Sequence, residues 1–102
     1  MSGWDTIIVG GGSAGCVLAE ALSRNSAHRV LLIESGRSDR SPWIHIPGTF
    51  FKVMQRGTDA IVYRGEAEPG LGGRPCLVPQ GHVLGGGSSV NAMLYVRGQP
   101  QD

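Results

Sequence analysis

Three glycines and one acidic residue near the amino end have the types and spacing that bind a nucleotide diphosphate and its ribose. Gly10, Gly12 and Gly15 follow the apolar run 7–9 in a Gly-x-Gly-x-x-Gly pattern, and Glu34 stands about 20 residues further on. Gly10 permits a tight turn, Gly12 leaves the backbone open to a pyrophosphate, and Gly15 lets a helix pack close to a strand. The helix start would offer N–H groups to the phosphates, and Glu34 would accept hydrogen bonds from the ribose hydroxyls.

The elements that must position these residues are two buried strands and one helix. The apolar runs 7–9 and 30–33 predict parallel strands. Between them, apolar residues recur at helical spacing and predict one apolar helix face, formed by Ala14, Val17, Leu18, Ala21 and Leu22. Residues 1–36 are therefore predicted to form one βαβ unit. The alternative is a nucleotide-free unit whose glycines only serve packing, and the motif alone does not separate NAD from FAD.

A second glycine-rich segment lies near the carboxyl end. Three consecutive glycines, residues 85–87, precede Ser88 and Ser89, either of which can cap a helix whose first turns would be residues 90–94. Backbone donors oriented at a helix start bind anionic or electron-rich ligand edges. The residue pattern alone favours the alternative, an ordinary glycine loop followed by a serine-capped helix.

Residues 37–78 read as a mostly irregular connection. Its apolar cluster is interrupted by prolines, with a short helix expected over residues 49–55 and short strands over 59–63 and 76–79. Irregular segments longer than about 15 residues are uncommon in a compact domain that folds alone. Two strands of a parallel sheet also need cover on both faces. We therefore expect this chain to need further polypeptide to complete its core.

Composition excludes several function classes. Nine basic and eight acidic residues give a net charge of +1 without a basic stripe, so nucleic acid is not an expected partner. No apolar run reaches the ~20 residues of a membrane span, no secretion signal is evident, and a cytoplasmic location is the default expectation. Cys16 and Cys76 have neither zinc-site nor redox spacing, so both are expected to be structural, and no metal is expected.

Taken together and in this order, the two glycine-rich segments resemble the glucose–methanol–choline (GMC) family of FAD-dependent oxidoreductases. Residues 5–36 resemble the opening FAD fold of that family. Residues 46–48 and 68–74 resemble the stretch that leads into its first signature, and residues 81–98 are similar to the signature itself. The resemblance implies an α/β fold with a Rossmann-like FAD-binding βαβ unit and a long irregular FAD-covering segment, incomplete without further polypeptide. The expected parts are the unit at 1–36, the connection at 37–78 and a second FAD-contacting motif at 79–98.

The resemblance also implies roles for individual residues. Those around the FAD pyrophosphate would be Gly10, Gly12, Ser13, Ala14 and Gly15. Glu34 would hold the adenosine ribose, and Val83 would contact the flavin half through its backbone. Gly86 and Ser88 would line the FAD, and the residues along the isoalloxazine would be Asn91, Ala92, Met93 and Leu94. Donors there would stabilise negative charge on the flavin as it accepts a hydride.

Three features of this sequence depart from the pattern of the family. His82 stands where Lys or Arg is usual, Gly87 where Ser or Cys is common, and no clear Asp-Trp pair occurs at residues 59–60. In members that attach FAD covalently within this signature, a histidine occupies the place of Val90. Valine cannot form that bond, so non-covalent FAD is expected.

The family resemblance implies an FAD-dependent oxidase or dehydrogenase that moves a hydride from the CH–OH group of a small-molecule alcohol to flavin N5. The catalytic base of the family is a histidine near the carboxyl end of the enzyme, and His28, His45 and His82 do not sit in a matching motif. No catalytic residue is therefore expected within residues 1–102, and the remaining polypeptide of the enzyme, with its substrate domain, is the expected partner. Alternatives are a hydroxynitrile lyase on the same scaffold with structural FAD, or a non-catalytic dinucleotide-binding module.

Overall fold

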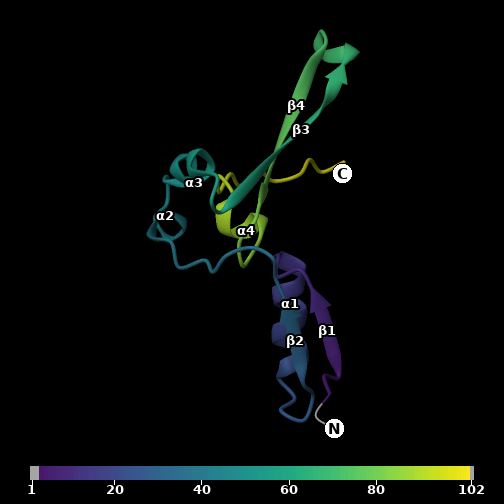
Figure 1. The fold of residues 1–102 in the computed structure, drawn as a ribbon. Coiled ribbons are helices and arrows are strands. Elements are labelled where there is room, and N and C mark those ends of the chain that lie inside the picture. Colours follow the sequence, from purple (N-terminus) through teal and green to yellow (C-terminus); the bar gives the residue numbers. More distant parts are fainter. Residues whose placement is uncertain (1–2, 102) are drawn as a thin grey trace.

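A parallel βαβ unit forms the amino-terminal part of the computed structural model, which describes residues 3–101 (Figure 1). Strand β1 (Thr6–Val9) is followed by helix α1 (Ser13–Ser23) and strand β2 (Val30–Ile33). The two strands pair in parallel from Thr6 opposite Val30 to Val9 opposite Ile33. The predicted α/β fold and its opening unit are confirmed.

Two glycines make the turn between β1 and α1 possible. Gly10 adopts a φ of 99°, a left-handed conformation that side chains disfavour. A Cβ atom on Gly15 would lie 1.9 Å from the carbonyl oxygen of Gly10. The helix therefore approaches the end of β1 as closely as the glycine spacing predicts.

The helix face that packs on the strands differs from the predicted one. Gly15 is buried and Cys16 and Ala19 are half-buried, whereas Val17 is 68% exposed and Leu18 52% exposed. The remaining residues of the predicted apolar face, Ala14, Ala21 and Leu22, are also exposed. Small residues face the strands because the close approach at Gly15 leaves no room for larger ones. Within residues 3–101, the larger apolar side chains of α1 stay exposed.

A short helical segment follows β2 and contains most of the small core. Helix α2 (Pro42–His45) leads to helix α3 (Phe50–Arg56), close to the helix expected over residues 49–55. Gly57 ends α3 in the left-handed conformation that commonly stops helices. Val53 of α3 packs with two later valines, Val83 and Val90, and with the half-buried side chains of Trp43 and Ile44. This core fixes the second glycine segment against the connection.

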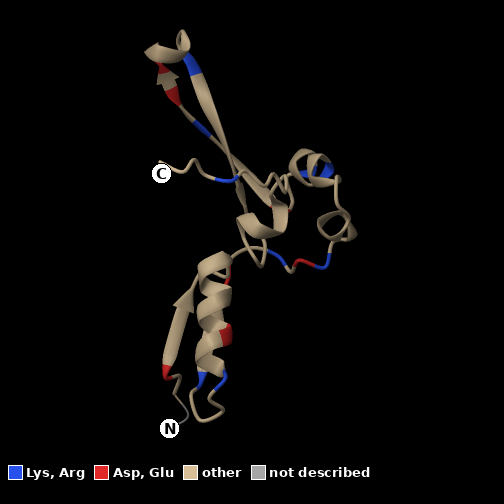
Figure 2. Cartoon of the chain, turned by 180° about the vertical axis from the view of Figure 1, so that it is seen from behind, with Lys and Arg blue, Asp and Glu red and all other residues tan. Residues whose placement is uncertain are grey.

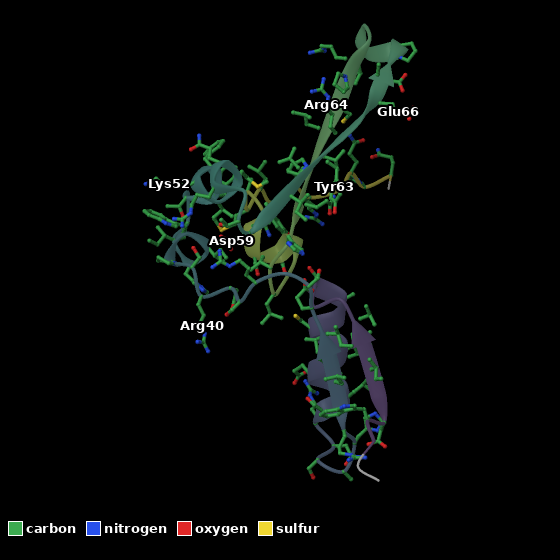
Figure 3. The ribbon with its side chains drawn as sticks, viewed as in Figure 1. Arg40, Lys52, Asp59, Tyr63, Arg64 and Glu66 are labelled. Atoms are coloured by element: carbon green, nitrogen blue, oxygen red, sulfur yellow. The ribbon has the colours of Figure 1, made fainter. Side chains whose placement is uncertain are left out.

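The second half of the connection is a long hairpin rather than irregular chain. Strand β3 (Ala60–Glu68) pairs antiparallel with strand β4 (Arg74–Gly81), and a 3-10 turn, η1 (Pro69–Leu71), joins them. Prolines suggested a broken structure here, but Pro75 and Pro79 lie on β4, which has β3 as its one paired neighbour. A strand at a sheet edge tolerates proline because its outer N–H groups have no ladder to join. The hairpin projects from the rest of the chain, with Tyr63, Arg64 and Glu66 exposed along β3 (Figures 1 and 3).

The helix predicted to run through residues 90–94 is shorter and begins earlier. Helix α4 (Gly87–Val90) is one turn long, its N-cap is Gly86, and no side chain caps it. Ser88 and Ser89 therefore lie inside the helix instead of capping it. The chain becomes extended at Asn91, whose Oδ1 accepts a hydrogen bond from Met93 N at 2.8 Å. Such local side-chain bonds compete with helix continuation, which explains the early end.

Charged residues are scattered over the described residues and do not gather into one basic stripe (Figure 2). Within residues 3–101, no helix has the length and apolar character that crossing a membrane requires.

Candidate dinucleotide site

The two glycine-rich turns meet although they lie at opposite ends of the sequence. The N–H of Gly85 donates to the carbonyl oxygen of Gly11 at 2.7 Å. A Cβ atom added to Gly86 would lie 2.9 Å from the Cα of Gly12, so the two backbones touch without side chains between them. The fold thus places the start of α4 beside the start of α1 (Figure 1).

An extension of the β2 chain brings the two turns together. Arg37 forms a parallel bridge with Val83, in which Leu84 N donates to Arg37 O at 2.8 Å and Arg37 N donates to His82 O at 3.4 Å. On the other side, His82 N donates to Asp59 O at 2.9 Å, just before β3. The second glycine segment is therefore held by backbone pairing on both sides.

The start of α1 has the properties of a phosphate cradle. Its N-cap is Gly12, no side chain caps it, and no acidic residue lies in its first turn. The first N–H groups of a helix have no partner within the helix, and here Cys16 N is the first to bond back, to Gly12 O at 2.9 Å. Apart from its chain neighbours, no residue among 3–101 has an atom within 4 Å of where a Gly12 side chain would stand. Open space thus faces the N–H groups of Gly12, Ser13 and Ala14, which have no acceptor within that range, as anion binding requires.

Glu34 lies at the end of β2 with its carboxylate fixed toward the same turns. Its Oε1 accepts from Gly36 N and its Oε2 accepts from Gly11 N, each at 2.6 Å. These two hydrogen bonds, first that of Gly36 and then that of Gly11, hold the pKa of Glu34 below its usual value. Partial burial opposes the shift, and the nearby His82 adds to it. An ionised carboxylate with lone pairs to spare can accept further hydrogen bonds from hydroxyl groups of a ligand.

The second segment offers backbone groups rather than side chains. Val83 is fully buried, and within residues 3–101 its N–H donates to no acceptor. The backbone of Gly36 covers this N–H, since a Cβ atom added to Gly36 would lie 2.3 Å from Val83 N. Ser88 Oγ donates to Gly85 O at 2.6 Å, and Ser89 Oγ donates to Leu84 O at 2.7 Å. These serine bonds stabilise the glycine turn itself.

The residues expected along an isoalloxazine follow α4. One helical turn separates Gly86, which touches the first glycine turn, from Asn91. Asn91 Nδ2 donates to Ser88 O at 3.2 Å, and Met93 adopts a φ of 54°, which is uncommon for a residue with a side chain. Asn91 and Ala92 line a hollow of about 470 Å³ together with Phe50, Met54, Pro79, Gln80, Gly81, Gly87 and Val90. Met93 and Leu94 are largely exposed.

The sequence did not predict a role for some residues of the site. Gly11 and Gly85 form the hydrogen bond that joins the two turns, but in the sequence they differ from the other glycines around them in no way. The buried Asp59, which holds His82 through its carbonyl oxygen, carries no sequence signal of its own.

Two of the three histidines are tied to neighbours away from the glycine turns. His28 Nε2 lies 2.9 Å from Thr6 Oγ1, and His45 Nε2 lies 2.7 Å from Asp39 O. His82 Nε2, in contrast, lies 3.0 Å from Ser35 Oγ, beside Glu34.

Comparison with known proteins agrees with this geometry. The family model described as GMC oxidoreductase matches residues 4–102. The chain is 48% identical over 99 residues to an oxygen-dependent choline dehydrogenase of Vibrio vulnificus (strain YJ016), covering 97% of this chain and 18% of the relative. The chain thus spans under a fifth of the length of that relative.

Solved structures show the same fold. Pyridoxine 4-oxidase from Mesorbium loti superposes with a TM-score of 0.86 at 41% identity, over 97% of this chain and 19% of that one. An FAD-dependent oxidoreductase from Chaetomium thermophilum superposes with a TM-score of 0.77 at 35% identity, over 94% of this chain and 16% of that one. The chain therefore belongs to the GMC oxidoreductase family, and its cofactor is FAD.

Proposed function

We propose that this chain is the FAD-binding part of an oxidoreductase that transfers a hydride from the CH–OH group of an alcohol to flavin N5. The observation that carries the proposal is the junction of the two glycine turns, where Gly85 N donates to Gly11 O and Gly86 lies against Gly12. Two backbone cradles in contact suit one ligand that has a diphosphate and a ring system. The names of two similar proteins, a choline dehydrogenase and a pyridoxine 4-oxidase, support an alcohol as the substrate class.

The residues divide the work of holding FAD. The N–H groups at the start of α1, from Gly12 to Gly15, would bind the pyrophosphate, with Gly10 forming the turn. The Glu34 carboxylate would accept the ribose hydroxyls, since its orientation is already fixed by two N–H groups. The backbone of Val83 would contact the flavin half of the cofactor, and Gly86 and Ser88 would line it. Asn91, Ala92, Met93 and Leu94 would lie along the ring system, where bound FAD supplies the hydride acceptor.

The catalytic base and the substrate domain would come from further polypeptide of the same protein. His28 and His45 are engaged with neighbours away from the site. The exposed apolar side chains of β1 and α1, such as Val9 at 83% and Val17 at 68%, need cover that residues 3–101 do not provide. This arrangement would leave cofactor binding to this chain and proton removal to the partner domain.

FAD would be held without a covalent bond to this chain. Val90 is 8% exposed and packs in the core with Val53 and Val83. Its aliphatic side chain has no nucleophilic atom that could join the flavin. After denaturation and filtration of the full-length protein, we expect the yellow colour in the filtrate. Flavin that remains with the polypeptide would contradict this expectation.

Anaerobic mixing with alcohols tests the reaction class. The full-length protein, purified with its flavin, is mixed without oxygen with choline, pyridoxine and a simple aliphatic alcohol in turn. Loss of the oxidised flavin absorbance with at least one alcohol is the expected result. If the flavin stays oxidised with every alcohol while a cyanohydrin is cleaved, the protein is a lyase and the proposed reaction is wrong.

A further inference from the structure

His82 lies just before the second glycine segment in the sequence, and its ring contacts the residue that follows Glu34. Its ring Nε2 lies 3.0 Å from the hydroxyl oxygen of Ser35, the residue directly after Glu34. Its main chain is fixed on both sides, because His82 N donates to Asp59 O and His82 O accepts from Arg37 N. The ring therefore stands beside the carboxylate that would hold the adenosine ribose.

We propose that His82 is a positioning residue that makes the affinity for FAD depend on pH, with tighter binding when its ring is protonated. This inference rests on the proposed function, since it concerns how that same site holds the adenosine end of FAD.

The direction of the hydrogen bond between His82 Nε2 and Ser35 Oγ depends on the tautomer and the protonation of the ring. A neutral ring that carries its proton on Nδ1 accepts the Ser35 hydroxyl proton at Nε2, whereas a protonated ring donates from Nε2 to Ser35 Oγ. From that tautomer, protonation frees the Ser35 hydroxyl proton for a ligand acceptor. Protonation also places a positive charge beside Glu34, at the adenosine end of a ligand whose two phosphate groups make it anionic. Both effects favour FAD when the ring is charged.

Three charged groups lie near His82, and each could also affect how FAD binding depends on pH. Glu34 faces it from the end of β2, Arg37 pairs beside it, and Asp59 precedes β3. The second glycine segment, residues 85–90, contains no charged residue. The lowered pKa of Glu34 keeps that carboxylate ionised at mildly acidic pH. Histidine is the side-chain type that changes charge between about pH 5 and about pH 8.

The test is an FAD titration of the full-length protein between about pH 5.5 and about pH 8.5, with flavin fluorescence quenching as the readout. We expect the dissociation constant of the wild type to rise about two- to fivefold across this range, the scale of a partly exposed ion pair. His82→Lys keeps a charge throughout and should bind FAD tightly at every pH. His82→Gln has no charge and should bind at the weaker level at every pH.

His45→Gln is the matched control. His45 is exposed and bonds to one neighbouring oxygen, but this oxygen belongs to the Asp39 carbonyl and not to the segment of Glu34. This variant should keep the pH dependence of the wild type. A wild type whose FAD affinity does not change with pH, or a His82→Gln variant that keeps the wild-type slope, overturns the inference while FAD binding and the proposed function stand. A wild type that binds no FAD at any pH overturns the proposed function itself.

Discussion

Glu34 shows how much of a site a single residue type and spacing can predict. An acid about 20 residues after the last glycine was expected to face a ribose, and its carboxylate does lie at the first glycine turn, bonded to Gly11 N. The sequence could not predict that Gly36 N would hold the other oxygen, because that contact depends on how the chain leaves β2. Nor could it predict that Ser88 and Ser89 would bond within the glycine turn instead of capping a helix. Local hydrogen bonds of this kind depend on backbone angles that the pattern of residue types leaves open.

Replacing Glu34 by Gln should weaken FAD binding of the full-length protein by about 10- to 100-fold, the range for a lost hydrogen bond to a charged group. The amide keeps the shape, but its NH₂ group cannot accept from Gly11 N or Gly36 N. The matched control is Glu20→Gln, which removes a charge that pairs with Arg24 on the exposed side of α1. Fluorescence titration with FAD measures both variants. Equal affinity of Glu34→Gln and the wild type would rule out the ribose role.

The lowered pKa of Glu34 also predicts how stability changes in acid. A carboxyl group with a lower pKa in the folded state adds stability above its unfolded pKa, and that stability is lost as the pH falls through the folded pKa. The wild type should therefore lose thermal stability more steeply than Glu34→Gln as the pH falls below about 4.5. Melting temperatures across an acid series measure this difference. Parallel curves for the two proteins would contradict it.

At the scale of elements, short-range patterns predicted β1, α1 and β2, and longer-range packing decided the rest. The apolar runs located both strands, but the helix turned its small residues toward them because Gly15 sits against Gly10 O. The hairpin β3–β4 was not predicted, because Pro75 and Pro79 suggested irregular chain. Both prolines are tolerated because they lie on a strand with an unpaired edge. Helix α4 ended at Val90 because Asn91 bonds to Met93 N. Each miss reflects a backbone approach, a strand edge or a local hydrogen bond that the spacing of apolar residues does not encode.

Two glycines of the first turn should respond differently to the same substitution. Gly15→Ala places a Cβ atom against Gly10 O, so the helix must shift, at a cost of about 1–3 kcal/mol in the free energy of unfolding. Gly12→Ala meets no protein atom within 4 Å and should change that free energy by less than about 1 kcal/mol, yet reduce FAD binding because the methyl group occupies the phosphate space. Urea unfolding and FAD titration of the full-length variants separate the two effects. A Gly12→Ala variant with unchanged FAD affinity would contradict the position of the diphosphate.

At the scale of the whole molecule, the chain leaves large apolar side chains uncovered on the βαβ unit. Val9, Val17 and Leu18 are each more than half exposed, and among residues 3–101 β1 and β2 form a two-stranded sheet. The family resemblance and the long connection suggested that further polypeptide would complete the fold, and the small core of three valines agrees with that expectation. Composition alone could not show which faces are open, since the same residues could have packed inside one small domain.

Leu18→Glu should therefore destabilise the full-length protein by about 2–4 kcal/mol, because the charge would be buried under the covering layer. Glu20→Lys, on the same helix at an exposed position that already carries a charge, is the control and should change stability by less than about 1 kcal/mol. Chemical unfolding measures both. If Leu18→Glu is as stable as the wild type, that face of α1 lies in solvent in the complete protein.

A crystal structure of the full-length protein with FAD would show whether both glycine turns hold one cofactor. We expect one FAD molecule that spans both turns, with its diphosphate at the N–H groups of Gly12 and Ser13, its ribose at Glu34 and its isoalloxazine along Asn91–Leu94. An FAD molecule that touches the first turn but leaves residues 91–94 free of the ring would show that the second turn does not bind the flavin.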